Sequence, residues 1–108
     1  MDGDGRSYKI DGRELIAEAP GLRVQILTIG AGQCVPWHFH SNITDTFFCL
    51  DGPMVVATRE PEARHVLQPG ESCAVLPGRP HRVSGQDDGP CRFAIVQGVG
   101  VYDFVPTE

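Results

Sequence analysis

Residues 32–52, GQCVPWHFHSNITDTFFCLDG, bring two histidines and an aspartate close together between two glycines. In the first part of the stretch, polar and apolar residues alternate as they do in a β-strand. Successive side chains of a strand point to opposite faces, so His38 and His40 share one face, about 6.6 Å apart along the chain. Trp37 and Phe39 then point to the other face. The stretch therefore predicts a strand that presents two imidazoles to one ion.

Asp45 follows the two histidines after the polar connection SNIT, which is short enough to reverse the chain. We expect it to open the neighbouring antiparallel strand and to place a carboxylate beside the two imidazoles. Two histidines and a carboxylate are a recurring metal-binding set that leaves positions open for substrate or oxygen. The alternative is an aspartate that only hydrogen-bonds to nearby backbone or to Thr44 or Thr46.

A second candidate segment, LPGRPH (residues 76–81), ends in another histidine. Its two prolines reduce the conformational freedom that ordering the turn would otherwise remove. We expect this stiff turn to deliver His81 to the start of a following strand. A rigid turn that ends in a histidine suits a preorganised metal ligand.

The remainder of the chain also favours β-structure, because 13 glycines and 9 prolines divide it into short runs. Most runs are rich in Val, Ile, Leu, Phe and Thr, and turn residues separate them. Eight or more strands at a spacing near ten residues predict an all-β sandwich or barrel. The segment GRELIAEA (residues 12–19) fits an edge strand and a short helix equally well. Beyond the histidine-bearing stretch, strands are expected at residues 22–29, 44–50, 54–59, 63–67, 72–76, 81–85 and 91–105.

The chain resembles the small single-domain cupins. The first motif of this family is G-x5-H-x-H-x3–4-E-x6-G. Gly32, His38, His40, Asp45 and Gly52 occupy it at the expected spacings, with Asp in place of Glu. The shorter Asp side chain would lie closer to an ion than Glu or would bind through a water molecule.

The second cupin motif is G-x5-P-x-G-x2-H-x3-N. Gly70, Gly78 and His81 match it, whereas Leu76 takes the place of the proline and Gly85 that of the asparagine. Both motifs occur in the expected order, and the resemblance covers residues 32–85.

The resemblance implies an antiparallel jelly-roll barrel with one divalent metal ion inside it. Carried over residue by residue, its ligands would be His38, His40, Asp45 and His81. Iron is the favoured metal, and manganese, nickel, zinc and copper are the alternatives. Three histidines that converged inside a barrel without an ion or other partners would be costly to desolvate.

Composition limits the class of protein. A chain of 108 residues is expected to form one domain, with a loose tail at residues 1–7 and the barrel at residues 8–108. With 14 acidic and 9 basic residues, it offers no basic surface for nucleic acid or an anionic membrane. No apolar run approaches the ~20 residues of a membrane span. The four cysteines form no C-x-x-C pair and the N-terminus is polar, so we expect reduced thiols and a cytoplasmic protein.

The residues on the same face as the expected ligands are candidates for the wall of a small-molecule pocket. Strand parity assigns to this set Cys34, Phe47, Cys49, Phe93, Ile95 and Gln97. A mostly apolar wall with few polar groups is typical of such pockets. Plain filling of the barrel is nevertheless the favoured interpretation for all of them except Gln97.

Three further side chains lie outside the expected site. Trp37 and Phe39 should be largely buried, either between sheet layers or against a second copy of the chain, since small cupins commonly form homodimers. His65 matches no motif position and is expected at the surface.

The sequence leaves two classes of function open. The first is a metal-dependent enzyme that acts on a small organic substrate, either an oxygenase or an isomerase or lyase. The second is a non-catalytic module that binds or senses a small molecule. No lysine lies near the motifs, and Tyr102 is the one candidate for a general base. Because proton transfer needs such a base close to the metal, this shortage favours oxygen chemistry.

Overall fold

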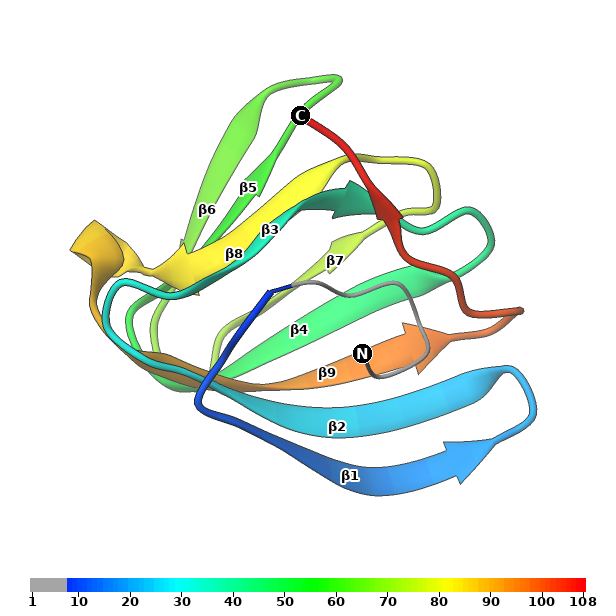
Figure 1. The fold of residues 1–108 in the computed structure, drawn as a ribbon, viewed down its shortest axis with the longest axis horizontal. Coiled ribbons are helices and arrows are strands. Elements are labelled where there is room, and N and C mark those ends of the chain that lie inside the picture. Colours follow the sequence, from blue (N-terminus) through cyan, green and yellow to red (C-terminus); the bar gives the residue numbers. More distant parts are fainter. Residues whose placement is uncertain (1–7) are drawn as a thin grey trace.

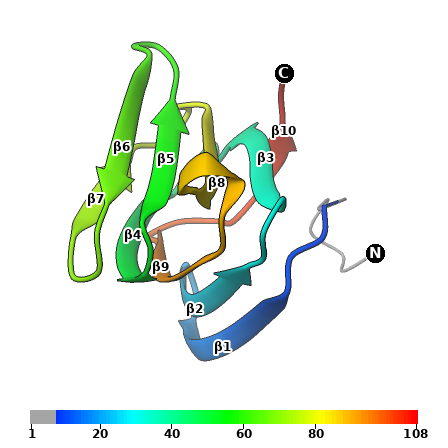
Figure 2. The ribbon, with the colours of Figure 1, turned by 90° about the vertical axis from the view of Figure 1, so that its left-hand side faces the viewer.

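The computed structural model describes residues 8–108, so the predicted tail at residues 1–7 lies outside the described part. Two antiparallel sheets of five strands face each other (Figures 1 and 2). The first contains, in spatial order, β1 (Gly12–Ala19), β2 (Leu22–Ile29), β9 (Cys91–Gly98), β4 (Thr44–Asp51) and β7 (Ser72–Val75). The second contains β10 (Val105–Pro106), β3 (Cys34–Phe39), β8 (His81–Gly85), β5 (Met54–Thr58) and β6 (Ala63–Leu67).

The predicted all-β, antiparallel jelly-roll class is confirmed. Hydrogen bonds join neighbours within each sheet and do not close the described strands into one continuous barrel. One short 3-10 helix, Gln86–Asp88, follows β8. Among residues 8–108, no helix is long and apolar enough to span a membrane.

The sequence pattern explains most of the strands. In β9, buried and half-buried residues alternate along the whole strand, as expected where one face of a sheet covers a core. The segment at residues 12–19, for which a helix was the alternative, forms edge strand β1. The predicted strands at residues 22–29, 63–67 and 81–85 have the bounds expected from the sequence.

The predicted long strand at residues 91–105 is wrong in its second half, because β9 ends at Gly98. A Cβ atom added at Gly98 would lie 2.8 Å from Leu22 Cδ1 and 2.9 Å from the Gly21 carbonyl oxygen. Gly100 has a φ of 154°, which side chains other than glycine rarely adopt. At these glycines the chain leaves the first sheet, and it then pairs with β3 of the second sheet as β10.

The expectation that Asp45 lies on the strand paired with the histidine strand is also wrong. β3 pairs with β8 and β10, whereas β4 pairs with β7 and β9 in the other sheet. Residues 40–43 therefore carry the chain from one sheet to the other. The carboxylate meets the imidazoles across the interior of the molecule and not along a shared strand ladder.

Apolar side chains fill the interior between the sheets. Thirteen buried hydrophobic residues form one cluster. At one end of the sheets the cluster contains Ile29, Cys49, Met54, Leu67 and Cys91. Toward the other end, buried polar side chains replace it, and these make up the candidate site.

Candidate metal centre

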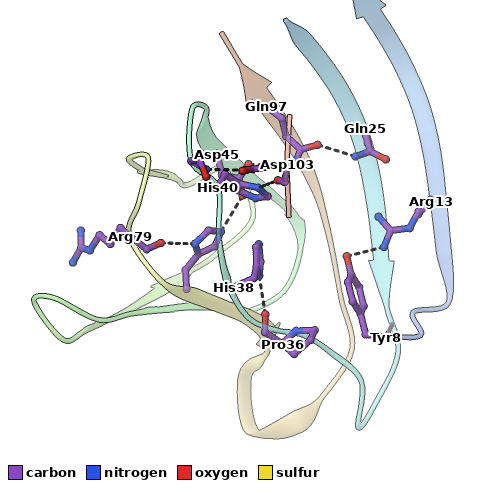
Figure 3. Close-up of polar contacts among 12 residues, drawn as sticks. Tyr8, Arg13, Gln25, Pro36, His38, His40, Asp45, Arg79, Gln97 and Asp103 are labelled. Carbon is purple, nitrogen blue, oxygen red and sulfur yellow. Dashed lines mark hydrogen bonds and ion pairs between the residues drawn. The ribbon is translucent and has the colours of Figure 1, made fainter. Parts of the chain in front are cut away.

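Three histidines and one aspartate converge at the polar end of the interior (Figure 3). His38 lies on β3, His40 directly follows it, His81 begins β8, and Asp45 lies on β4. All four side chains are at most 3% exposed. One possible ligand atom from each lies within 4.8 Å of the others. Both sheets thus contribute to the site, and all four residues expected from the sequence meet there.

Each imidazole makes a hydrogen bond through Nδ1 to a backbone carbonyl oxygen. The pairs are His38 with Pro36 (2.7 Å), His81 with Arg79 (2.9 Å) and His40 with Asp103. Because a carbonyl oxygen only accepts, each Nδ1 must carry the proton. In the neutral imidazole this leaves a lone pair on Nε2, and Nε2 is then the atom that can bind a metal ion. The backbone therefore fixes the tautomer of all three histidines.

Asp45 connects the imidazoles. Its Oδ2 atom lies 2.9 Å from Nε2 of both His40 and His81. Two adjacent ligands that each lie about 2.1 Å from one ion would be about 3 Å apart. The donor types and their spacing therefore fit one divalent metal ion.

Two glutamines extend the network beyond the ligands. Gln97 Nε2 donates to Asp45 Oδ1 at 3.2 Å, and Gln25 Nε2 donates to Gln97 Oε1 at 2.9 Å. A carboxylate can only accept, so Asp45 fixes the orientation of the Gln97 amide and, through it, that of Gln25. The sequence predicted Gln97 on the pocket wall but missed Gln25. The only sign of Gln25 in the sequence was a polar amide at an inward-facing position of an otherwise apolar strand.

Several hydrogen bonds hold the turn before His81. Gly78 has a φ of 79° and donates its backbone N–H to the His40 carbonyl oxygen at 2.7 Å. The guanidinium of Arg79 donates to Thr58 Oγ1 and to two carbonyl oxygens of the β5–β6 turn. These contacts position the carbonyl that holds His81.

Burial and neighbouring charges shift the pKa values of the cluster. Burial, followed by the nearby His81 and His40, lowers the pKa of His38 from 6.5 to about 3. Burial also opposes the charged form of His40, but the hydrogen bond and charge of Asp45 outweigh it and raise the His40 pKa above 6.5. Burial would raise the pKa of Asp45, yet its bonds to His40 and His81 hold that pKa far below its usual range. Asp45 is therefore a carboxylate, and His38 a neutral ligand, at neutral pH.

A small cavity adjoins the cluster. The predicted wall residues Phe47, Phe93, Ile95 and Gln97 line it. It leaves about 20 Å³ accessible to the centre of a water molecule, whereas one water needs about 10–15 Å³ on the same measure. The cavity thus has room for an ion or a single water molecule.

Two candidates for the cavity wall, Cys34 and Cys49, do not line the cavity. The register of β3 shifts between Val35 and His38, so that Val35 and not Cys34 lies on the side of the ligands. Cys34 is half-buried opposite Ser84, outside the cavity. Cys49 does face inward, but it packs in the apolar cluster away from the cavity.

Aromatic rings from both ends of the described chain cover the cavity. Phe104 stacks on His38 with 4.3 Å between ring centroids, and Tyr8 stacks on Phe104 at 5.7 Å. Tyr102 lies 5.3 Å from His40, centroid to centroid. The sequence did not predict this cover, because it depends on the break after β9.

The remaining predicted side chains lie away from the cavity. His65 is exposed, as expected. Trp37 and Phe39 are each mostly buried, as expected, and neither is completely covered. The Trp37 ring is covered by the guanidinium of Arg59, whose Cζ atom lies 3.7 Å from the ring centroid.

A family model described as "Cupin domain" matches residues 25–97. This range contains every predicted metal ligand. A search of curated proteins gives no significant match.

Solved structures share the fold at low identity. An uncharacterized conserved protein with a double-stranded beta-helix domain from Klebsiella pneumoniae subsp. pneumoniae MGH 78578 is 21% identical, with a TM-score of 0.75 over 95% of this chain and 89% of that chain. KdgF from Halomonas sp. is 15% identical, with a TM-score of 0.70 over 92% and 93%. An oxalate oxidase is also 15% identical, with a TM-score of 0.71 over 81% of this chain and 46% of that chain.

Proposed function

The chain belongs to the cupin domain family, and on that premise we propose that it is a metal-dependent enzyme acting on a small organic substrate. His38, His40, His81 and Asp45 hold one divalent ion. The reaction is an iron-dependent oxygenation. The family accommodates many reactions, so the proposal depends on the site.

The observation that carries the proposal is the fixed tautomer of the three histidines. Three backbone carbonyls hold the three Nδ1–H groups, and the Nε2 atoms of His40 and His81 meet one carboxylate oxygen. A cluster of polar groups this deeply buried is costly to desolvate, and an ion would offset that cost by accepting the lone pairs.

The residues around the ligands support oxygen chemistry. Iron held here would supply redox activation of dioxygen, and Phe47 and Phe93 would exclude water from the reacting groups. Among the described residues that line the cavity, Asp45 is the one carboxylate and no lysine is present, so a separate general base of these types is lacking. One structural neighbour is an oxalate oxidase, and at 15% identity it supports only the capacity of this fold for such chemistry.

Metal analysis and oxygen uptake test the proposal together. The protein, purified without nickel resin, is analysed for bound metal, loaded with iron and screened for oxygen consumption with small diketones, phenolics and sugar acids. The proposal expects one ion per chain and uptake that His81→Ala abolishes. Turnover that persists without oxygen would assign an isomerase or lyase. Tight binding of one compound without turnover by any metal form would assign a binding module.

We also propose that the protein is a homodimer in a reducing compartment. All four cysteines are free thiols. Trp37 and Phe39 keep part of their surface exposed on β3 in the single chain. A second copy would cover such apolar surface. Sedimentation at micromolar concentration tests the dimer, and a monomer there would contradict it.

A further inference from the structure

A row of polar side chains crosses the inner face of the first sheet. Four neighbouring strands contribute one each: Asp45 from β4, Gln97 from β9, Gln25 from β2 and Arg13 from β1. All four line the same cavity, and Figure 3 shows them following one another from the imidazoles toward β1. An inward sheet face is normally apolar. The row therefore extends the polar character of the site to the edge of the sheet.

Arg13 ends this row with a positive charge. It is the one lysine or arginine among the described residues that line the cavity. Its Nη2 atom donates to the Tyr8 hydroxyl at 2.7 Å, and its Cζ atom lies 5.3 Å from the Tyr8 ring centroid. A neutral hydroxyl and a ring face use only some of the five N–H donors of a guanidinium and leave its charge without a counterion. A carboxylate would accept two parallel hydrogen bonds and neutralise the charge.

We propose that the cavity binds an organic acid whose carboxylate pairs with Arg13 and whose hydroxyl or carbonyl oxygens point toward the metal centre. The inference rests on the proposed metal site and names the substrate class for it. The charge of a divalent ion is larger than the single negative charge of Asp45, so the metal end of the row stays positive. The metal end and the Arg13 end would therefore both attract oxygen ligands. The amides of Gln25 and Gln97 between them suit further hydroxyl or carbonyl groups.

The spacing of the row sets the length of the acid. From β4 to β1 there are three strand spacings of about 4.8 Å, and the register places Arg13 level with Phe93, four residues along the sheet from Asp45 and Gln97, so the two backbones are about 20 Å apart along the sheet. Arginine has a long side chain that bridges part of this distance, so the ligand is an acid of several carbon atoms. In the present structure the guanidinium of Arg13 donates to the Tyr8 hydroxyl, and the stacked Tyr8 and Phe104 rings fill the space that the acid would take. The acid displaces both.

A matched pair of chelators tests the inference by calorimetry on the zinc-loaded protein. Succinylacetone carries a β-diketone and a remote carboxylate, whereas heptane-2,4-dione has the same diketone and chain length without the carboxylate. We expect the acid to bind at least about tenfold more tightly, because a charge-assisted pair contributes about 1.5–3 kcal/mol. Arg13→Gln should remove this advantage and leave the affinity for the neutral diketone unchanged.

Two variants control for charge and folding. Arg64→Gln removes the same charge from the exposed outer side of β6 and should keep the advantage of the acid. Arg13→Lys keeps the charge without the planar fork and should restore part of it.

An equal affinity of both compounds for the wild type, or an advantage that survives Arg13→Gln, would overturn the inference while zinc binding still supported the metal site. If zinc did not bind, the proposed function would fail. The same two compounds, measured on metal-free protein, would then decide the inference: Arg13-dependent binding of the acid would uphold it, and its absence would overturn it.

Discussion

The two ends of the space between the sheets have opposite chemistry. Within residues 8–108, the buried cluster at one end is made of apolar side chains and thiols, including Ile29, Cys49, Met54, Leu67 and Cys91. The other end buries three histidines, an aspartate and two glutamines at a similar depth. Some strands contribute to both ends. For example, β4 supplies Cys49 to the apolar end and Asp45 to the polar end. On β4 the apolar core and the candidate metal site are thus separated along one strand and do not belong to different elements.

Burial acts on titratable groups at both ends, with different results. At the apolar end it raises the pKa of the Cys91 thiol to about 12, so the group remains neutral and behaves as a small hydrophobic residue. At the polar end burial also opposes charge, but Asp45 remains ionised because two imidazoles bond to it. The apolar end stabilises the fold by about 1.5–3 kcal/mol for each large side chain buried. The buried polar groups described at the other end hydrogen-bond to one another and to the backbone, and their donor types also fit a metal ion.

The largest expected effect is a loss of stability at the apolar end. Met54 is completely buried, so Met54→Ala should lower the free energy of unfolding by about 2–5 kcal/mol through lost burial and a cavity. Urea unfolding measures this loss, and zinc titration of the folded variant should give the wild-type affinity. A clear loss of zinc affinity would show that the two ends are coupled and would break the comparison.

The next effect concerns the polar end. His81→Ala removes one of three imidazoles and should weaken zinc binding by more than about 100-fold, the upper range for a residue that only supports a ligand. The stabilisation that saturating zinc gives the wild type, about 4 kcal/mol at 1,000 times the dissociation constant, should fall to about 1.4 kcal/mol or less at the same zinc concentration. His65→Ala, at an exposed histidine, is the matched control. Unchanged affinity in His81→Ala would remove the metal site.

Local signals made much of this structure predictable. Glycine and proline turns marked the strands, and the spacing of two motifs identified His38, His40, Asp45 and His81, which the structure brings together. The histidines of this cluster were predictable because the turn before His81 and the strand at His38 encode their positions over a few residues.

Features that depend on distant segments were not predictable. The sequence alone does not show that residues 40–43 change sheets, so the predicted pairing of β3 and β4 was wrong although Asp45 does meet the histidines. The bulge in β3 reversed the parity of Cys34. Phe104 can cover His38 only because β9 ends at Gly98. At that position Leu22 packs so closely that only a glycine fits.

An intermediate effect should follow from changing a residue that bonds to a ligand without being one. Gln97→Leu removes the amide that orients Asp45 and should reduce zinc affinity by about 10–100-fold. Gln68→Leu, at an exposed position outside the cavity, should leave the affinity unchanged. Calorimetric titration with zinc separates the two variants. If both behaved alike, Asp45 would be held by its histidines alone.

The smallest effect is a dependence of stability on pH that the metal should reverse. In metal-free protein the folded pKa of His40 lies above 6.5, so the folded state binds more protons than the unfolded state between pH 6.5 and that pKa. Stability should therefore fall as the pH rises through this window. The folded pKa of His38 is about 3, so below pH 6.5 the unfolded state binds more protons and stability should fall as the pH drops.

The two histidines together place the stability maximum of the metal-free protein near pH 6.5. Within one pH unit of 6.5, each shift changes the free energy of unfolding by at most about 1.4 kcal/mol, which is the smallest of the four effects. Zinc must displace the proton from Nε2 of His40, so in zinc-saturated protein stability should rise with pH above 6.5. Urea unfolding across this range, with chelator or with zinc, measures both slopes. Parallel slopes in the two forms would mean that zinc does not compete with the His40 proton and binds elsewhere.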